Sequence, residues 1–204
     1  MNRKGFTLVE LSIVLIIIGL IIGGVLKGTD LINSAKQKKF YNTFVKTWQV
    51  AANQYQDRTG QILGDGANNG SAGTADGLRE TIDLSTTTTV QTRLAQIGLD
   101  VPVTNTGNSG SYSVEGKYVT SPTTATLRAQ SINGNNRNVF QLIAVPTDVA
   151  VAIDTMVDGT ADAGLGDARR TTATDTALTD ATAQWPSADP ANGGTATVNM
   201  TILF

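Results

Sequence analysis

One acidic residue stands inside an otherwise apolar run near the N-terminus. Glu10 lies five residues after Gly5, and the run from Gly5 to Leu26 carries no other charged residue. A carboxylate inside a membrane helix costs on the order of 3 kcal/mol, unless it takes up a proton or meets a cation. Glu10 is therefore predicted to pair with a cationic partner. The alternative interpretation is that it lies close to the lipid headgroups.

A second group of acidic residues, near the C-terminus, has the oxygen chemistry that metal ions prefer. Asp154, Asp158 and Asp162 follow one another at intervals of four residues, and Asp167 comes five residues later. Carboxylates of this kind suit Ca²⁺, although the spacing differs from that of an EF-hand loop. The other interpretation is that these side chains form caps, turns and a solvated acidic face.

The residue types that are missing exclude much of catalytic and cofactor chemistry. The chain of 204 residues contains no His and no Cys. It therefore has no Ser-His or Cys-His nucleophile pair, no Cys/His zinc cluster, no haem-ligating His and no disulfide. No GxSxG motif, P-loop or paired-carboxylate cleft can be traced. We predict a non-enzymatic protein that needs no cofactor, with calcium as the one open alternative.

The charge of the chain is divided between its two parts. The net charge is -2 and the isoelectric point is near 5.0. Residues 6–57 contain five Lys and three acids, whereas residues 58–204 contain eight basic and fourteen acidic residues. An acidic exterior of this kind keeps the protein soluble and discourages direct nucleic-acid binding.

The apolar run is long enough to cross a membrane. Gly5 to Leu26 comprises 22 residues, which as a helix would extend roughly 33 Å, about the thickness of the hydrocarbon core. Arg3 and Lys4 precede it and are expected on the cytoplasmic side. The run is longer than the apolar region of a signal peptide, and no small-x-small cleavage site ends it. We therefore predict a retained membrane helix.

The helix is predicted to continue beyond the membrane. Apolar residues recur at mostly three- and four-residue intervals with lysines between them, which is the period of an amphipathic helix. We predict one helix over residues 6–57, ended by the turn at Thr59 and Gly60. We also predict that its aromatic residues pack in a core and do not conduct electrons. The apolar positions are Leu31, Ala35, Phe40, Phe44, Trp48, Ala51, Ala52 and Tyr55.

The first residues resemble a known family signature. The segment Arg3 to Leu11, RKGFTLVEL, resembles the N-terminus of type IV prepilins and type II secretion pseudopilins. With the apolar run, the resemblance covers about 25 residues. It implies that a prepilin peptidase cuts between Gly5 and Phe6 and N-methylates Phe6. It also implies that Glu10 pairs with the new terminal amine of a neighbouring subunit during assembly.

Four glycines interrupt the apolar run. Filaments of this family often contain a proline where the helix melts, but here no Pro occurs before Pro102. Each Gly weakens a helix by about 1 kcal/mol relative to Ala, so flexibility is predicted here. Gly19 and Gly23 also form a GxxxG pair that allows helices to approach closely, and the two interpretations are compatible. The four positions are Gly19, Gly23, Gly24 and Gly28.

After Gly60 the sequence predicts a head domain of mixed helix and strand. Residues 64–77 read as a surface loop, and residues 87–97 as a short helix. Alternating strands are expected at 112–119, 125–131, 139–145 and 195–204. Short turns between consecutive strands imply an antiparallel sheet. The predicted fold class is α+β and pilin-like, with a leader (1–5), a helix (6–57) and a head (58–204) whose sheet packs on the helix.

A second segment also resembles pilin-like proteins. Residues 145–159 contain a Val-Pro turn, a short helix with Ile-Asp and an acidic-Gly ending, with Arg169 and Arg170 further on. The family pattern has two adjacent Asp before the Gly, whereas this chain has Val157 and Asp158. Asp148, directly after this turn, is predicted to cap the helix.

These observations lead to the prediction of a filament subunit. We expect the major or an abundant pilin of a type IV pilus, first anchored in the inner membrane and then assembled with other copies of itself in an extracellular fibre. Its further partners would be the prepilin peptidase and the pilus assembly machinery, with no direct binding of nucleic acid. The alternatives are a minor pilin, a periplasmic type II secretion pseudopilin or, in a different class, a membrane-anchored adhesin.

Overall fold

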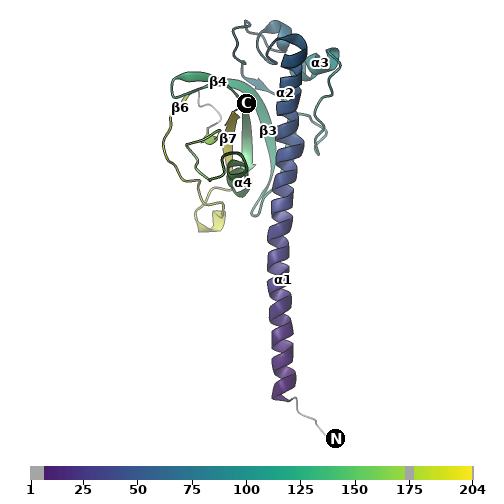
Figure 1. Cartoon of the computed structure of the whole chain (residues 1–204), viewed down its shortest axis with the longest axis vertical. Helices are drawn as coiled ribbons and strands as arrows, with labels where there is room; N and C mark the ends of the chain where they lie inside the picture. Colours follow the sequence, from purple (N-terminus) through teal and green to yellow (C-terminus); the bar gives the residue numbers. More distant parts are fainter. Residues whose placement is uncertain (1–6, 173–176, 204) are drawn as a thin grey trace. The chain divides into compact units, whose positions relative to one another are not determined.

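A computed structural model describes residues 7–172 and 177–203 of the chain. The chain divides into two compact units, residues 1–36 and residues 37–204. Figure 1 shows the main helices and strands. The helical elements are α1 (Leu8–Phe40), η1 (Tyr41–Val45), α2 (Lys46–Thr59), η2 (Ala67–Asn69), α3 (Thr89–Gln96), α4 (Thr147–Asp158) and η3 (Pro190–Asn192). The strands are β1 (Ile82–Asp83), β2 (Ser111–Glu115), β3 (Thr120–Ile132), β4 (Asn135–Pro146), β5 (Ala168–Thr171), β6 (Ala177–Leu178) and β7 (Thr197–Leu203).

The long helix agrees closely with its sequence prediction. α1, η1 and α2 follow one another without a break from Leu8 to Thr59. The helix ends at Gly60, which has a left-handed φ of 70° and donates its N–H to the carbonyl of Gln56 at 2.8 Å. Only glycine adopts this conformation without strain, which is why the helix stops here.

A π-helical turn, η1, lies inside the long helix and was not predicted. Phe40, Phe44 and Trp48 are spaced four residues apart and are all buried. In an α-helix each four-residue step drifts by about 40° around the axis. The wider π-turn reduces this drift and keeps the three rings on the side that faces the core.

Aromatic side chains join the helix to the sheet within residues 37–204. The ring of Phe44 lies 6.2 Å from that of Phe140 on β4 and 5.5 Å from that of Tyr112 on β2. Trp48 donates its indole N–H to the carbonyl of Ser109 at 2.9 Å, so its one polar atom is satisfied in the core. The prediction that the aromatic cluster serves packing is thus confirmed.

The sheet is antiparallel along its main path, as predicted. Its order is β1-β3-β4-β7-β5, with β2 and β6 also paired to β3, and only β6 runs parallel to its neighbour. The predicted strands correspond to β2, β3, β4 and β7. The sequence analysis missed β1, β5 and β6, which have only two to four residues and are too short for a period to be recognised.

The second face of the sheet is buried as well, and it is polar. Along β3, Ala125 and Leu127 belong to the apolar core, while Gln130 is also buried. Gln130 accepts a hydrogen bond from Thr201 on β7 at 2.9 Å and donates one to Thr171 on β5 at 3.2 Å. These bonds satisfy the amide in a place where an unpaired polar group would destabilise the fold.

The region predicted as a surface loop at residues 64–77 is partly buried, which corrects the sequence interpretation. Asp65 and Asn69 are only 4% and 2% exposed. The Asp65 carboxylate accepts the backbone N–H groups of Asp76 (3.0 Å) and Gly77 (2.9 Å), and Tyr55 donates its hydroxyl to Asn69 at 2.8 Å. Polar side chains that bind backbone groups allow this segment to pack without apolar periodicity.

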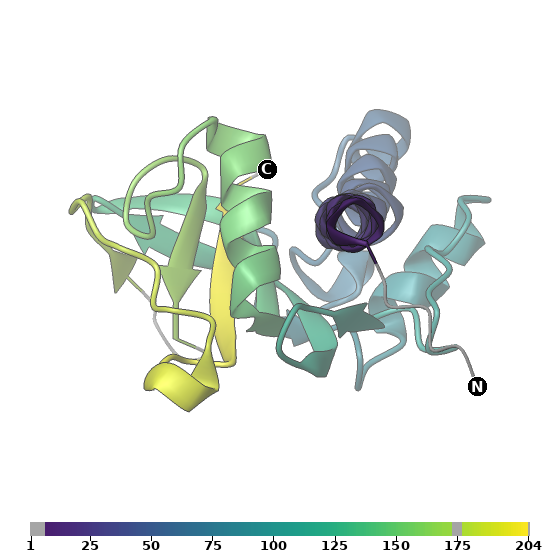
Figure 2. The same ribbon diagram turned by 90° about the horizontal axis from the view of Figure 1, so that it is seen from below.

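Helix α4 lies over β7 in both views of the head (Figures 1 and 2). The prediction that Asp148 caps α4 is wrong, because Pro146 occupies the cap position and no side chain makes the cap hydrogen bond. Asp148 lies inside the first turn, where its carboxylate accepts the N–H of Lys117 at 2.9 Å. It therefore ties the helix to the β2–β3 turn.

A bulge in β4 places a non-glycine residue in the left-handed region. Ala144 has a φ of 59°, where the pairing of β4 with β7 shifts register between Leu142 and Val145. The side-chain oxygen of Asn199 accepts the N–H of Ala144 at 2.9 Å, which replaces the lost strand hydrogen bond. Conformations of this kind cost about 1–2 kcal/mol for residues with a Cβ.

Candidate functional site

The most distinctive surface of the chain is the apolar half of α1. Every residue from Thr7 to Lys27 is exposed, including Leu8 (90%) and Leu20 (76%). Among the described residues this is the one helix long and apolar enough to cross a membrane. A contiguous apolar surface of this size is stable in water only when lipid or another protein surface covers it.

The helix begins with a capping box formed by Thr7 and Glu10. The Glu10 carboxylate oxygen Oε2 accepts the Thr7 backbone N–H at 2.8 Å and the Thr7 hydroxyl at 3.0 Å. In return, the Thr7 hydroxyl oxygen accepts the backbone N–H of Glu10 at 3.3 Å. This reciprocal pattern satisfies two N–H groups that the first helical turn leaves free.

The capping box fixes where the carboxylate lies. Because both bonds to Glu10 use Oε2, the other oxygen, Oε1, stays available to a cation that approaches the start of the helix. The sequence analysis had selected Glu10 but missed Thr7. The signal was present as a Thr three residues before a Glu at the start of an apolar run.

The glycines of α1 have no contacts that require their small size. A Cβ added at Gly19, Gly23, Gly24 or Gly28 would meet nothing within 4 Å. All four lie within the regular helix. Flexibility and close approach of a second helix therefore both remain predictions for these positions. Gly5 and Phe6, the predicted cleavage and methylation site, lie outside the described residues.

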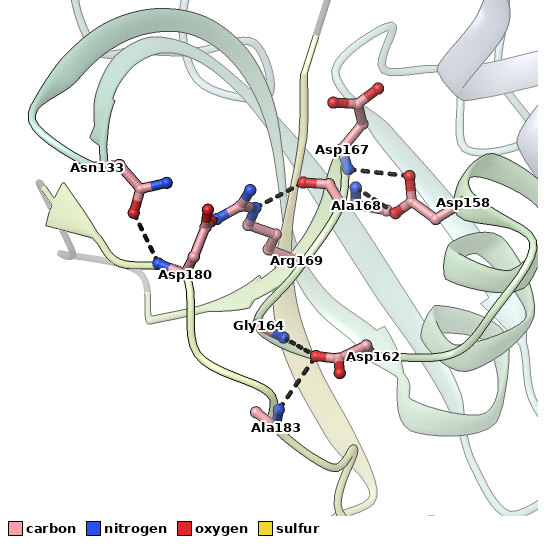
Figure 3. A network of polar contacts seen from close by, with 10 residues as sticks. Asn133, Asp158, Asp162, Gly164, Asp167, Ala168, Arg169, Asp180 and Ala183 are labelled. Carbon is pink, nitrogen blue, oxygen red and sulfur yellow. Dashed lines mark hydrogen bonds and ion pairs between the residues drawn. The ribbon is translucent and has the colours of Figure 1, made fainter.

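The acidic residues of α4 bind the segment that follows the helix (Figure 3). The Asp158 carboxylate accepts the N–H of Asp167 and the N–H of Ala168, both at 2.9 Å. Asp162 accepts the N–H groups of Gly164 (2.9 Å) and Ala183 (3.1 Å) through one oxygen. These carboxylates thus act as acceptors for backbone groups.

Asp154 is the most buried of the acidic residues, with no exposed surface. Its Oδ2 accepts the N–H of Asp162 at 2.8 Å and the indole N–H of Trp185 at 2.7 Å. The pKa of Asp154 is raised to about 6, chiefly because the carboxyl is buried and also because the Asp158 carboxyl is near, while the Trp185 hydrogen bond opposes this shift. Asp154 therefore joins α4 to two parts of the segment 159–189.

A salt bridge completes this network. Arg169 on β5 pairs with Asp180, and Asn133 accepts the backbone N–H of Asp180 at 2.7 Å. The Arg169 bond holds the pKa of the Asp180 carboxyl below its usual value. The pKa of Asp162 is likewise lowered, first by the N–H of Gly164 and then by that of Ala183.

Each of the three residues predicted as calcium ligands accepts hydrogen bonds from within the chain. Within residues 7–172 and 177–203, no group of three or more acidic side chains is arranged to hold a metal ion. The carboxylates of Asp154, Asp158 and Asp162 are used by N–H donors instead. Ca²⁺ takes six to eight oxygen ligands around one point, so calcium binding at Asp154, Asp158 and Asp162 stays a prediction.

Comparisons with known proteins relate these features to a family. A family model described as "Prokaryotic N-terminal methylation motif" matches residues 1–26. No curated protein and no solved structure matches the chain. The motif implies a precursor anchored in the inner membrane and processed by prepilin peptidase. This motif marks the type IV pilin and pseudopilin family, and the chain combines it with a pilin-like α+β fold in which a long helix packs on an antiparallel sheet.

Proposed function

We propose that this protein is the major or an abundant subunit of a type IV pilus filament. The observation that carries the proposal is the fully exposed apolar stretch of α1, which contains the single charged residue Glu10. An apolar helix can leave the bilayer without a large loss of free energy only if the same surface is buried again. Other copies of the same helix provide that surface in a filament core.

Glu10 would set the register of assembly. Cleavage between Gly5 and Phe6 creates a terminal amine one residue before the capping box. When a second copy brings its amine beside the free Oε1 of Glu10, the ion pair relieves a carboxylate that is costly in an apolar environment. Because an unpaired charge there is destabilising, only one axial position of the neighbouring helix satisfies both groups.

The size of the head favours an abundant subunit over a minor one. Residues 58–204 form a head with seven strands and two α-helices of their own among the described residues, and Glu10 is present. A minor pilin that only initiates the fibre has no subunit ahead of it at the tip. Such a subunit does not need Glu10 to pair with the terminal amine of a neighbour. The type II secretion pseudopilin, located in the periplasm, is the competing outcome of the first experiment.

The first experiment identifies the processed form and its location. Surface-sheared material is analysed by intact mass spectrometry and electron microscopy. We expect fibres composed of a chain that lacks residues 1–5 and carries one additional methyl group. A processed chain confined to the membrane fraction would favour the pseudopilin or a minor pilin, and an uncut chain would contradict the proposal.

Two substitutions separate processing from assembly. Gly5→Trp should leave the leader attached and abolish filaments, because the bulky side chain obstructs the peptidase. Glu10→Ala should still be cut but should assemble poorly or without N-methylation. Filaments at wild-type yield from Glu10→Ala, with Gly5→Trp behaving as expected, would remove Glu10 from the mechanism while leaving processing intact.

A further inference from the structure

β5 is the outermost strand of the sheet on the side of β7. Among the described residues the sheet order ends with β7-β5, and β5 pairs with β7 along one of its two sides. The free side of an edge strand presents N–H and C=O groups with which another strand can pair. The outer side of β5 is therefore a place where a strand of a second chain could be added.

The hydrogen bonds between β5 and β7 show which backbone groups point outward. Leu203 donates its backbone N–H to the carbonyl of Asp167 at 2.9 Å, so Asp167 directs this carbonyl toward β7. Backbone groups of successive residues in an antiparallel strand point to alternate sides. Arg169 therefore also faces β7, whereas Ala168 and Arg170 direct their N–H and C=O groups to the outer side.

Both outward N–H groups are already bound within the chain. The Asp158 carboxylate oxygen Oδ2 accepts the N–H of Ala168 at 2.9 Å (Figure 3), and the carbonyl of Ala163 accepts that of Arg170 at 2.8 Å. The carbonyls of Ala168 and Arg170, by contrast, accept no hydrogen bond from the described residues. The edge is thus closed at its donors and open at its acceptors.

The local structure is built to bring the Asp158 carboxylate to this edge. Its other oxygen, Oδ1, accepts the N–H of Asp167 at 2.9 Å. Gly166 has a φ of 82°, and a Cβ at this position would lie 2.3 Å from Oδ2 of Asp158. Glycine is therefore required here for the carboxylate to reach β5. An ionised carboxylate accepts hydrogen bonds but donates none, so it satisfies the edge without offering a donor to a further strand.

We propose that the outer edge of β5 is a strand-addition site that Asp158 keeps closed, and that the partner kept out is β5 of a second copy. Two β5 edges in antiparallel pairing would place Ala168 of each copy opposite Arg170 of the other, so that every outward N–H meets an outward C=O. The two copies of Arg169 would then face one another, but each guanidinium is already paired with Asp180. The edge is therefore self-complementary, as a twofold interface requires.

This inference goes beyond the proposed function and does not depend on a filament. Copies of the chain anchored in one membrane meet at a high effective concentration. Under these conditions an open edge would join the heads in a wrong arrangement, whereas a closed edge keeps them separate. Asp158, which the sequence analysis predicted as a metal ligand, thus has a role in preventing association.

Removal of the carboxylate provides the test. Sedimentation equilibrium of the detergent-solubilised full chain measures its self-association. Asp158→Ala is expected to lower the dimer dissociation constant about tenfold, which corresponds to about 1.4 kcal/mol. Asp158→Asn keeps one acceptor oxygen and the shape of the side chain, so it should fold like the wild type and show a smaller shift in the same direction. Near-UV circular dichroism checks that each variant is folded.

Two further variants show where the association occurs. Asp162→Ala removes the same charge from the same segment, but its carboxylate binds the N–H groups of Gly164 and Ala183 and not those of β5. Its dissociation constant should therefore equal that of the wild type. Arg170→Pro removes an outward N–H from an edge strand, a position where proline is tolerated. Combined with Asp158→Ala, it should abolish the added association.

Three results would overturn the inference. The first is a wild-type dissociation constant for folded Asp158→Ala, or for Asp158→Asn if the alanine variant does not fold. The second is association of Asp162→Ala as strong as that of Asp158→Ala, and the third is association that Arg170→Pro leaves unchanged. Either of the last two would assign the contact to a loosened segment away from β5. The filament itself is tested separately, by mass spectrometry and electron microscopy of the sheared material.

Discussion

At the scale of single residues, Glu10 caps the long helix, and in the proposed function its carboxylate also pairs with a cation of a second copy. Its Oε2 is engaged by the N–H and hydroxyl of Thr7 at 2.8 and 3.0 Å. A carboxylate held in this way keeps one orientation, so a cation entering from the N-terminal end finds the other oxygen already placed. The conformational entropy of the Glu10 side chain is therefore already lost in the free subunit, and the proposed assembly would not have to order it again.

We predict that Thr7→Val weakens the first turn of α1. The substitution keeps the branched shape but removes the hydroxyl, and the loss of such a cap costs about 1 kcal/mol. Amide hydrogen exchange of the detergent-solubilised chain should accelerate about fivefold at residues 8–11. Thr29→Val is the matched control, because Thr29 bonds only the carbonyl of Leu26 in the middle of the helix. Equal exchange in both variants would contradict the role of the capping box.

At Ala144, the fold holds a side chain in a backbone conformation that favours glycine. Ala144→Gly should stabilise the head by about 0.5–1 kcal/mol, because relief of the left-handed strain exceeds the added chain entropy. Thermal unfolding would show the increase. Ala144→Val, whose branched side chain tolerates this φ of 59° less well, should lower the melting temperature. A lower stability of the glycine variant would show that the bulge is not strained.

At the scale of elements, α4 holds the segment 159–189 through carboxylates spaced one turn apart. Asp154 and Asp158 accept N–H groups from Asp162, Asp167 and Ala168. Since residues at i and i+4 lie on the same helix face, both carboxylates reach the same segment. Trp185 adds an anchor from the far end of that segment. The helix therefore fixes the described parts of the long connection that contains β5 and β6.

The burial of Asp154 predicts that the stability of the head depends on pH. Its pKa of about 6 in the folded chain lies above the ordinary 3.8. The protonated form is favoured by folding, so this contribution is complete below pH 4 and is lost as the pH rises through 6. We expect the free energy of unfolding to fall by roughly 2 kcal/mol over that window. The lowered pKa values of Asp162 and Asp180 act only below it.

Urea unfolding between pH 4 and pH 7 measures this dependence. Asp154→Asn should remove most of it, because the amide stays neutral at every pH. Asp167→Asn, on the exposed part of the same segment, should retain it. A flat stability profile of the wild-type chain between pH 4 and 6 would rule out a shifted Asp154.

At the scale of the whole molecule, the chain combines an apolar surface that must be covered with a head whose core is complete. Phe44, Trp48 and Phe140 are fully buried, so the second unit contains its own packed interior. The residues from Thr7 to Lys27 have no such cover. The packed interior of the head therefore provides most of the free energy of folding, whereas burial of the exposed helix would provide the free energy of the proposed assembly.

The four glycines of α1 provide a test at this scale. Gly19→Ala and Gly23→Ala should each stabilise the helix by about 1 kcal/mol, and neither added Cβ meets an atom within 4 Å in the chain. If these glycines allow close helix packing between copies, filament yield should fall, whereas Gly28→Ala should be tolerated. If they provide flexibility, all the substitutions should slow assembly in proportion to the helicity gained, as circular dichroism in detergent would show.

The long helix and four of the strands follow from the local order of residues alone. The apolar run is followed by residues with the period of an amphipathic helix. The helix ends at Gly60 because the left-handed backbone conformation of this one residue stops it. Glu10 was selected because a charge inside an apolar run is anomalous in any fold, whereas Gly5 and Phe6 were assigned through the family resemblance. Local periodicity and one anomalous residue carry this information without tertiary contacts.

Tertiary structure decided what depends on residues far apart in the sequence. The use of Asp154 as an acceptor required Trp185, 31 positions later, to lie beside it. The polar second face of the sheet required Gln130 to meet Thr201 across 71 positions. From the sequence alone, such polar residues are interpreted as solvent-exposed or metal-binding. Their hydrogen-bond donors are far away in the sequence and come close only when the chain folds. The acidic residues of α4 were ambiguous for this physical reason, and the fold assigned them to backbone N–H groups.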